Sequence, residues 1–175
     1  IYAYFPEYKE QGVLEGLDPE RIVVTGNPIV DILETYFLSG RIRLDAAARD
    51  ALFAEYDIAS SDFLVMTAHR RENVEAPEPL AQVLALAGEA GRQVVFPASY
   101  RTQRNIASFG LDIPANVRII DPIGYTELLE LMVKSAGVLT DSGTVVEEAA
   151  VLGVPTVQMR RSTERPQVYD CGLSV

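Results

Sequence analysis

The stretch Leu139-Thr-Asp-Ser-Gly-Thr-Val-Val-Glu-Glu-Ala-Ala150 joins a strand pattern to a helix pattern through a glycine turn. The start of such a helix exposes unpaired backbone N–H groups and the positive end of the helix dipole, so it can hold a phosphate. Ser142 can cap the helix and donate to a phosphate oxygen. Glu148 lies more than one turn further along, where a carboxylate can accept hydrogen bonds from both hydroxyls of a ribose. The stretch therefore predicts either a nucleotide site or an ordinary capped helix.

Short apolar runs alternate with helical patterns along the rest of the chain. The expected strands cover residues 21–25, 63–67, 93–96, 117–120, 137–140 and 155–159. The expected helices cover the segment after Pro28, residues 45–56, 79–90, 102–108 and 125–135, and the segment after Ser142. This alternation predicts an α/β fold with a Rossmann-like doubly wound parallel sheet, which binds ligands beyond the carboxyl ends of its strands.

The ends of the chain and its composition narrow the class of protein. Residues 1–8 show no clear element and residues 172–175 read as the start of a strand, so we expect one domain, residues 1–175, cut from a longer protein. A net charge of −10 argues against a nucleic acid or a membrane as partner. The single cysteine, Cys171, and the single histidine, His69, exclude an internal disulfide and a multi-histidine metal site. We expect a cytoplasmic location from this composition.

Arginines gather in the loops that follow predicted strands of this acidic chain. His69-Arg70-Arg71-Glu72-Asn73 follows one strand and combines an acid/base group with guanidinium groups, which suit diphosphate oxygens. Ser162-Thr163-Glu164-Arg165-Pro166 follows the last strand and offers groups that can bind a sugar or a phosphate. Solvated surface loops are the alternative for both segments. The helical spacing of Tyr125, Leu128 and Leu131 predicts core positions.

Four segments occur in the order found in a known family. They are Thr25-Gly-Asn-Pro-Ile-Val-Asp31, Thr67-Ala-His-Arg-Arg-Glu-Asn73, Thr140-Asp-Ser-Gly-Thr-Val-Val-Glu-Glu-Ala149 and Thr163-Glu-Arg-Pro166. With these motifs the chain resembles the non-hydrolysing UDP-N-acetylglucosamine 2-epimerases, which are similar in fold to the two-domain GT-B glycosyltransferases. The chain resembles only the second, UDP-binding domain of the family. The resemblance implies UDP or a UDP-sugar as ligand and an N-terminal domain missing from this chain, and it leaves open a homodimer of the full-length form.

The resemblance also implies a role for each matching residue. Ser142, Gly143 and Thr144 would meet the diphosphate, Glu148 the ribose, and the backbone near Leu128 the uracil. His69 would lie near the diphosphate or the sugar, as the one candidate in this chain for a part in the chemistry. The other residues expected to line or close the pocket are Arg70, Arg71, Glu72, Asn73, Thr163 and Arg165. The chain departs from the family at Thr144, where a second glycine is usual, and at Ser99, where a histidine of a regulatory UDP-N-acetylglucosamine site is common.

The family reaction inverts C2 of UDP-N-acetylglucosamine by anti elimination of UDP and re-addition to the other face, with no metal or redox cofactor. The carboxylates that transfer the proton belong to the first domain of the family. The resemblance therefore implies part of an isomerase that supplies surface-polysaccharide precursors and is inactive as an isolated domain. The alternatives are a GT-B glycosyltransferase or hydrolysing epimerase domain, a non-catalytic nucleotide-sugar sensing module, and an α/β domain without a ligand.

Overall fold

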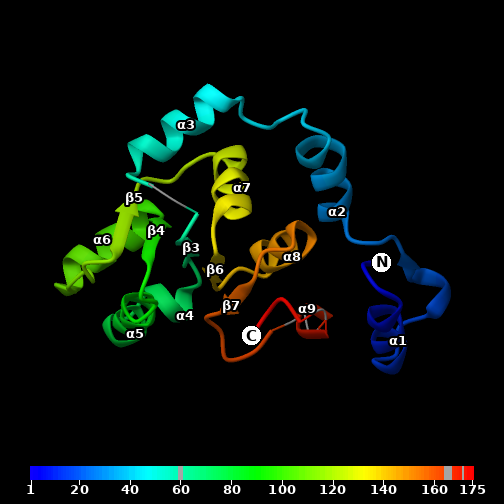
Figure 1. Cartoon of the computed structure of the whole chain (residues 1–175). Helices are drawn as coiled ribbons and strands as arrows, with labels where there is room; N and C mark the ends of the chain where they lie inside the picture. Colours follow the sequence, from blue (N-terminus) through cyan, green and yellow to red (C-terminus); the bar gives the residue numbers. More distant parts are fainter. Residues whose placement is uncertain (59–60, 164–166, 171) are drawn as a thin grey trace. The chain divides into compact units, whose positions relative to one another are not determined.

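The computed structural model describes residues 1–58, 61–163, 167–170 and 172–175, and the chain divides into two compact units, Ile1–Arg41 and Ile42–Val175. A five-stranded parallel sheet forms the centre of the second unit (Figure 1). Its strands are β3 (Phe63–Thr67), β4 (Gln93–Pro97), β5 (Val117–Ile120), β6 (Gly137–Thr140) and β7 (Thr156–Gln158). The order across the sheet is β5-β4-β3-β6-β7, with every neighbouring pair parallel. The predicted Rossmann-like α/β fold is thus confirmed.

Helices connect the successive strands, as the alternating sequence pattern predicted. They are α3 (Ala46–Glu55) before the sheet, α4 (Arg71–Val74) and α5 (Pro77–Gly88) after β3, α6 (Tyr100–Phe109) after β4, α7 (Tyr125–Lys134) after β5, α8 (Gly143–Leu152) after β6, and α9 (Gln167–Asp170) after β7. Beyond α9, Ser174 pairs in parallel with Thr156 of β7. The start of a strand that the sequence predicted at residues 172–175 thus takes the form of an isolated bridge.

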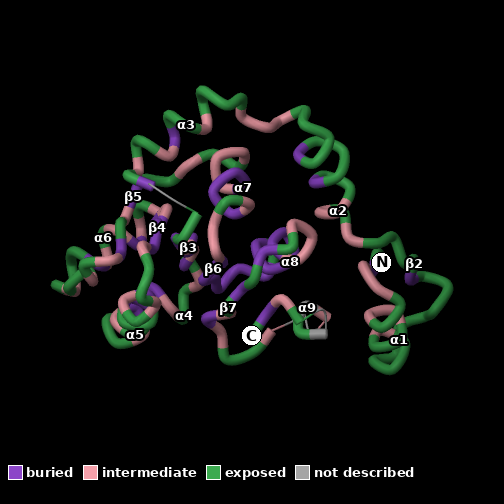
Figure 2. Tube along the Cα trace, viewed as in Figure 1, coloured by how far each residue is buried: buried purple, intermediate pink, exposed green. Residues whose placement is uncertain are grey.

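Different helices cover the two faces of the sheet. Met66 and Leu139 pack in a buried cluster whose helical members come from α4, α5 and α6. Side chains alternate between the faces of a strand, so Phe63 and Val65 point to the opposite face, where α7 and α8 contact the strands. Figure 2 shows burial concentrated along the strands and along α8.

The strand order reverses between β3 and β6. The chain runs from β3 outward to β5 and then returns to the other side of β3, where Thr67 lies in register with Thr140. Ligands of doubly wound sheets bind outside the carboxyl ends of the strands at this switch point. The segments that begin with Ala68 and Asp141 therefore lie where this fold places a ligand site.

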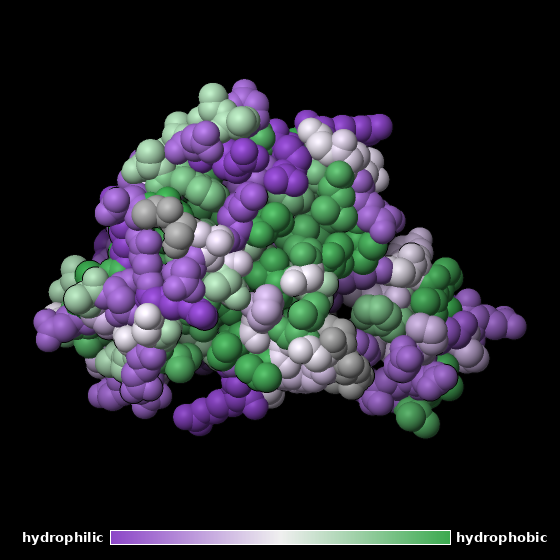
Figure 3. Space-filling view, in the orientation of Figure 1, coloured by the Kyte–Doolittle hydropathy of each residue, from purple (hydrophilic) through white to green (hydrophobic). Residues whose placement is uncertain are grey.

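The first unit, residues 1–41, is a small parallel strand pair with one crossover helix. Its elements are β1 (Tyr2–Ala3), α1 (Pro6–Leu14), the 3-10 turn η1 (Pro19–Arg21), β2 (Val23–Val24), α2 (Pro28–Ile32) and the π-helical segment η2 (Leu33–Leu38). Tyr2 and Leu14 of this unit are exposed. Figure 3 shows hydrophobic surface together with hydrophilic surface on this face of the molecule. The expectation that residues 1–8 lack an element was wrong, and the strand expected at 21–25 is shorter. The assignment of residues 1–175 to one UDP-binding domain stays a prediction.

Candidate functional site

Asp141 joins the two loops at the switch point. Its side chain is completely buried, and its carboxylate accepts the backbone N–H of His69, at 3.0 and 3.1 Å, and that of Arg70, at 2.9 Å. The Asn73 side-chain amide donates to the same carboxylate at 3.0 Å and to the carbonyl of Met159 at 2.9 Å. Hydrogen bonds to an ionised acceptor are stronger than neutral ones. Asp141 therefore holds the His69–Asn73 segment against the start of α8.

His69 keeps contact with this carboxylate while it remains open to solvent. Its Nδ1 lies 3.3 Å from Asp141 Oδ1, and its side chain is 55% exposed. A carboxylate partner at Nδ1 favours the tautomer protonated there, which leaves Nε2 as a proton acceptor. The geometry suits a group that either donates to a phosphate or accepts a proton at the mouth of the crevice.

The start of α8 is capped by Ser142. Its Oγ accepts the N–H of Val145 at 3.3 Å, and its own N–H donates to Thr140 Oγ1 at 3.0 Å. A hydroxyl that accepts one hydrogen bond keeps its proton for a further acceptor, such as a phosphate oxygen. Gly143 is buried as the first residue of the helix, and Thr144 beside it is exposed. The arrangement offers a hydroxyl and backbone N–H groups to an anion.

Glu148 lies in the second turn of α8 and is almost fully buried, with 3% of its surface exposed. The hydroxyl of Tyr125, the first residue of α7, donates to Glu148 Oε1 at 2.8 Å. Burial raises the pKa of Glu148, the hydrogen bond from Tyr125 lowers it, and the charge of Glu147 raises it. Burial and the hydrogen bond to Glu148 both raise the pKa of Tyr125. The pair is thus a buried carboxylate held by one phenol donor.

The other residues of the His69–Asn73 segment point in different directions. Arg70 Nε donates to the carbonyl oxygen of Asp141 at 2.8 Å, so its guanidinium packs over the turn. Arg71 has an 83% exposed side chain and pairs with Glu75 at 3.6 Å. Only part of the predicted set, His69, Arg70 and Asn73, therefore converges on Asp141.

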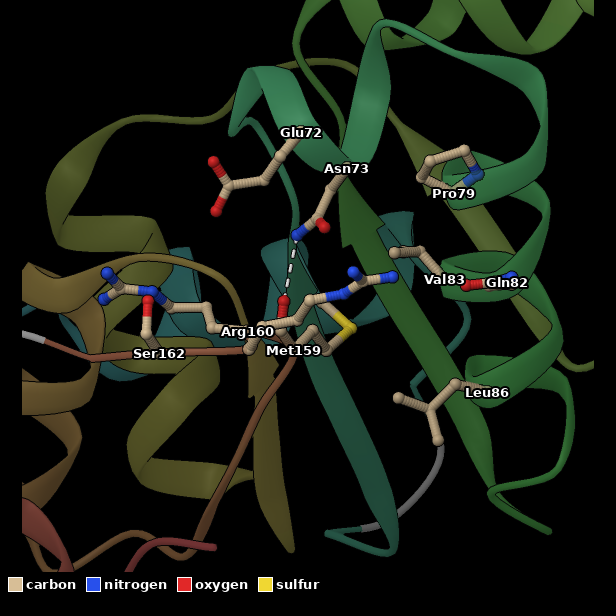
Figure 4. A pocket seen from close by; sticks show the side chains of 10 residues that line it. Glu72, Asn73, Pro79, Gln82, Val83, Leu86, Met159, Arg160 and Ser162 are labelled. Carbon is tan, nitrogen blue, oxygen red and sulfur yellow. Dashed lines mark hydrogen bonds between the residues drawn. The ribbon is translucent and has the colours of Figure 1, made fainter.

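A cavity of about 700 Å³ opens between α5 and the segment after β7 (Figure 4). It is lined by Glu72, Asn73, Pro79, Gln82, Val83, Leu86, Met159, Arg160, Arg161 and Ser162. The α5 face of the sheet carries it, whereas Tyr125 and Glu148 belong to α7 and α8 on the other face. The predicted pocket residues Glu72 and Asn73 thus also border a hollow separate from Glu148.

A family model described as UDP-N-acetylglucosamine 2-epimerase matches residues 2–175. The chain belongs to this family. The UDP-N-acetylglucosamine 2-epimerase of Methanocaldococcus jannaschii is 31% identical over 169 residues, which cover 92% of this chain and 45% of that protein. The UDP-2,3-diacetamido-2,3-dideoxy-D-glucuronate 2-epimerase of Pseudomonas aeruginosa is 39% identical over 122 residues, 67% of this chain and 34% of that one.

Solved structures of the same 2-epimerase family agree with the fold. The crystal structure of the M. jannaschii 2-epimerase in complex with UDP-N-acetylglucosamine and UDP superposes with a TM-score of 0.79 at 28% identity. That match covers 99% of this chain and 49% of the solved chain. This 2-epimerase family member therefore spans less than half the length of each of these relatives.

At one predicted core position the structure of this epimerase family member contradicts the sequence prediction. Tyr125 was expected in the core, but 40% of it is exposed; Leu131 is buried as predicted and Leu128 is half-buried. Ser99 caps α6 by accepting the N–H of Thr102 at 3.2 Å. Thr163 is half-buried, and Arg165 lies outside the described residues.

Two features went unrecognised in the sequence. No role was predicted for Asp141, although a carboxylate directly after a buried strand can indicate a side chain that anchors a neighbouring loop by hydrogen bonds. The pairing of Tyr125 with Glu148 leaves no local signal, because 23 residues separate the partners. Within the described part of the chain, no helix is long and apolar enough to cross a membrane, and no three His, Cys, Asp or Glu side chains are placed to hold a metal ion.

Proposed function

We propose that this chain is the UDP-binding part of an enzyme that epimerises C2 of a UDP-linked N-acetylated amino sugar. The observation that carries the proposal is the buried Glu148 carboxylate one turn beyond the Ser142-capped start of α8. The diphosphate would lie at this helix start, where the N–H groups and the helix dipole favour an anion. The ribose hydroxyls would donate to Glu148, and the backbone near Leu128 would face the uracil.

The reaction would break the bond between C1 and the UDP oxygen while the proton leaves C2. The resulting 2-acetamidoglucal would then take back UDP at C1 and a proton on the opposite face of C2. The part of the chain at hand would hold and orient the UDP leaving group, with His69 beside the diphosphate or the sugar. Arg70, Arg71, Glu72, Asn73, Thr163 and Arg165 remain proposed pocket residues.

The groups that move the C2 proton would lie in a further domain of a longer protein. The relatives' greater length supports this division, since the chain covers 45% of the M. jannaschii enzyme. The isolated chain would then bind UDP without catalysing epimerisation. The same logic leaves any homodimer, and a role in supplying polysaccharide precursors, to the full-length enzyme.

A UDP-diacetamido-dideoxy-glucuronate is a second candidate substrate beside UDP-N-acetylglucosamine. The P. aeruginosa relative named for that sugar is 39% identical over 67% of this chain. Both sugars carry UDP at C1 and an acetamido group at C2. The binding of UDP would be common to the two, and the groups that distinguish the sugars would contact C3 and C6.

Calorimetric titration of the 175-residue chain with UDP tests the proposal. We expect saturable UDP binding, with UMP and ADP at least about tenfold weaker, since each lacks either the second phosphate or the uracil and tenfold corresponds to about 1.4 kcal/mol. A thermal shift with UDP should agree, because a ligand specific to the native state raises stability by about 2.7 kcal/mol at one hundred times its Kd. Equal affinity for UDP and ADP, or no UDP binding, would contradict the assignment.

A further inference from the structure

The phenol of Tyr125 is placed unlike a core tyrosine. It occupies the first position of α7, with 40% of the residue exposed, yet its hydroxyl reaches inward to Glu148 Oε1 at 2.8 Å. Within the described residues this is the one hydrogen bond made to the Glu148 carboxylate, and it joins two helices that succeed each other on the same face of the sheet. A tyrosine that only filled the core would bury its ring, whereas Tyr125 keeps 40% of its surface exposed and directs its hydroxyl to a buried carboxylate.

The hydrogen bond fixes what Glu148 can offer to a ligand. An ionised carboxylate accepts about four hydrogen bonds over its two oxygens. Tyr125 takes one of these on Oε1 and thereby sets the plane of the carboxylate, which leaves Oε2 and the second lone pair of Oε1 for a diol. Burial raises the pKa of Glu148 and the tyrosine hydrogen bond lowers it, so the phenol also favours the ionised form that accepts.

We propose that Tyr125 is a positioning residue that sets the Glu148 carboxylate for ribose, so that the preference of the site for a ribose over a 2′-deoxyribose depends on the tyrosine hydroxyl. The inference rests on the proposed UDP site and adds to it a residue outside the motifs. Tyr125 acts through Glu148: its hydroxyl donates a hydrogen bond to Oε1, and the acceptor sites that remain on the carboxylate meet the sugar.

The test compares UDP with 2′-deoxy-UDP on the 175-residue chain by calorimetry. We expect wild-type protein to bind UDP about thirtyfold more tightly than 2′-deoxy-UDP, as for one hydrogen bond to a charged group. Tyr125→Phe should weaken UDP binding about tenfold and change the affinity for 2′-deoxy-UDP little, so the ratio of the two affinities should fall. Glu148→Gln should abolish the preference for UDP over 2′-deoxy-UDP. The double variant should bind UDP no more weakly than Glu148→Gln alone, because the tyrosine acts only through the carboxylate.

The matched control is Tyr100→Phe, which removes an exposed hydroxyl from α6 on the opposite face of the sheet and should leave both affinities unchanged. Phenylalanine keeps the half-exposed ring of Tyr125, and a thermal melt checks that the variant folds. Wild-type ribose preference that survives in Tyr125→Phe would overturn the role of Tyr125 and leave the UDP site intact. Absence of UDP binding by the wild-type chain would instead overturn the UDP site, and with it this inference.

Discussion

Asp141 and Glu148 are buried carboxylates on either side of the first turn of α8, and their surroundings differ sharply. Asp141 is completely buried and accepts hydrogen bonds from two backbone N–H groups and a side-chain amide, and the His69 imidazole lies 3.3 Å away. Glu148 is 3% exposed and, among the residues that the structure describes, accepts a hydrogen bond from one donor, the Tyr125 phenol. A buried carboxylate whose acceptor sites are filled holds the chain together, whereas one with acceptor sites left over is suited to a ligand.

A third buried carboxylate shows that burial by itself does not distinguish a structural carboxylate from one suited to a ligand. Glu130 of α7 is completely buried and accepts Arg43 Nε at 2.5 Å, Arg43 Nη2 at 3.0 Å and the N–H of Leu44 at 3.1 Å. It fastens the segment before α3 to α7, and its donors resemble those of Asp141 in number. Glu130 therefore belongs with Asp141, and Glu148 stands apart by its single donor.

The largest effect should come from Asp141→Ala. The substitution removes the acceptor of the His69 and Arg70 N–H groups and one of the two acceptors of the Asn73 amide. A donor shielded from water and left without a partner costs about 1–3 kcal/mol. We expect the free energy of unfolding to fall by about 4 kcal/mol in urea denaturation followed by circular dichroism. The matched control, Asp112→Ala, alters an exposed aspartate and should stay within about 0.5 kcal/mol of wild type.

A loss below about 1 kcal/mol in Asp141→Ala would break the comparison, because it would mean that the loop does not depend on its carboxylate. The same variant should also lose UDP binding, since the His69–Asn73 segment would no longer be held against α8. Retention of full UDP affinity alongside a large loss of stability would show that the tie and the site are independent.

Glu148→Gln should have the opposite balance, with binding weakened and stability kept. UDP affinity should fall about thirtyfold, as for loss of a hydrogen bond to a charged group. Because burial raises the pKa of Glu148 in the folded state, the folded protein holds its proton more strongly than the unfolded chain. The unfolding free energy of wild type should therefore fall, relative to Glu148→Gln, as the pH rises from the ordinary glutamate pKa of about 4.3 to the raised folded value.

Parallel urea titrations at pH values from about 4 to about 7.5 measure this difference, starting just below the ordinary glutamate pKa. Glu89→Gln serves as the control, because it makes the same chemical change at an exposed position at the end of α5. A Glu148→Gln variant that is less stable than wild type at neutral pH would place Glu148 with Asp141 and Glu130, as a structural carboxylate.

The sequence predicted the contiguous parts of the fold and of the candidate site. The sheet was predictable because runs such as Phe63–Thr67 are continuously apolar, and the loop set at the switch point was predictable because His69–Asn73 is contiguous. The elements of residues 1–14 were missed because β1 has two residues and α1 buries none of its own, which leaves no periodic pattern.

The pairing of Tyr125 with Glu148 was out of reach for a different reason. The helical spacing of Tyr125, Leu128 and Leu131 predicted core positions, yet Tyr125 is the first residue of α7 and is 40% exposed. Its contact depends on how α7 and α8 lie beside each other in space. No local pattern encodes that arrangement.

Substitution of Ser142 should have the smallest effect. Ser142 lies between Asp141 and Glu148 in the sequence, and it has both a structural role and a proposed binding role. Its Oγ caps α8 by accepting the Val145 N–H, and its hydroxyl proton remains for a phosphate oxygen. Ser142→Ala should lower the free energy of unfolding by about 1 kcal/mol, and Ser142→Gly by a few tenths, since glycine is tolerated at this cap position. Both variants should lose about tenfold in UDP affinity, because both lack the hydroxyl. If Ser142→Gly instead binds UDP like wild type, the hydroxyl serves the helix alone and the diphosphate is held by the backbone N–H groups and the helix dipole.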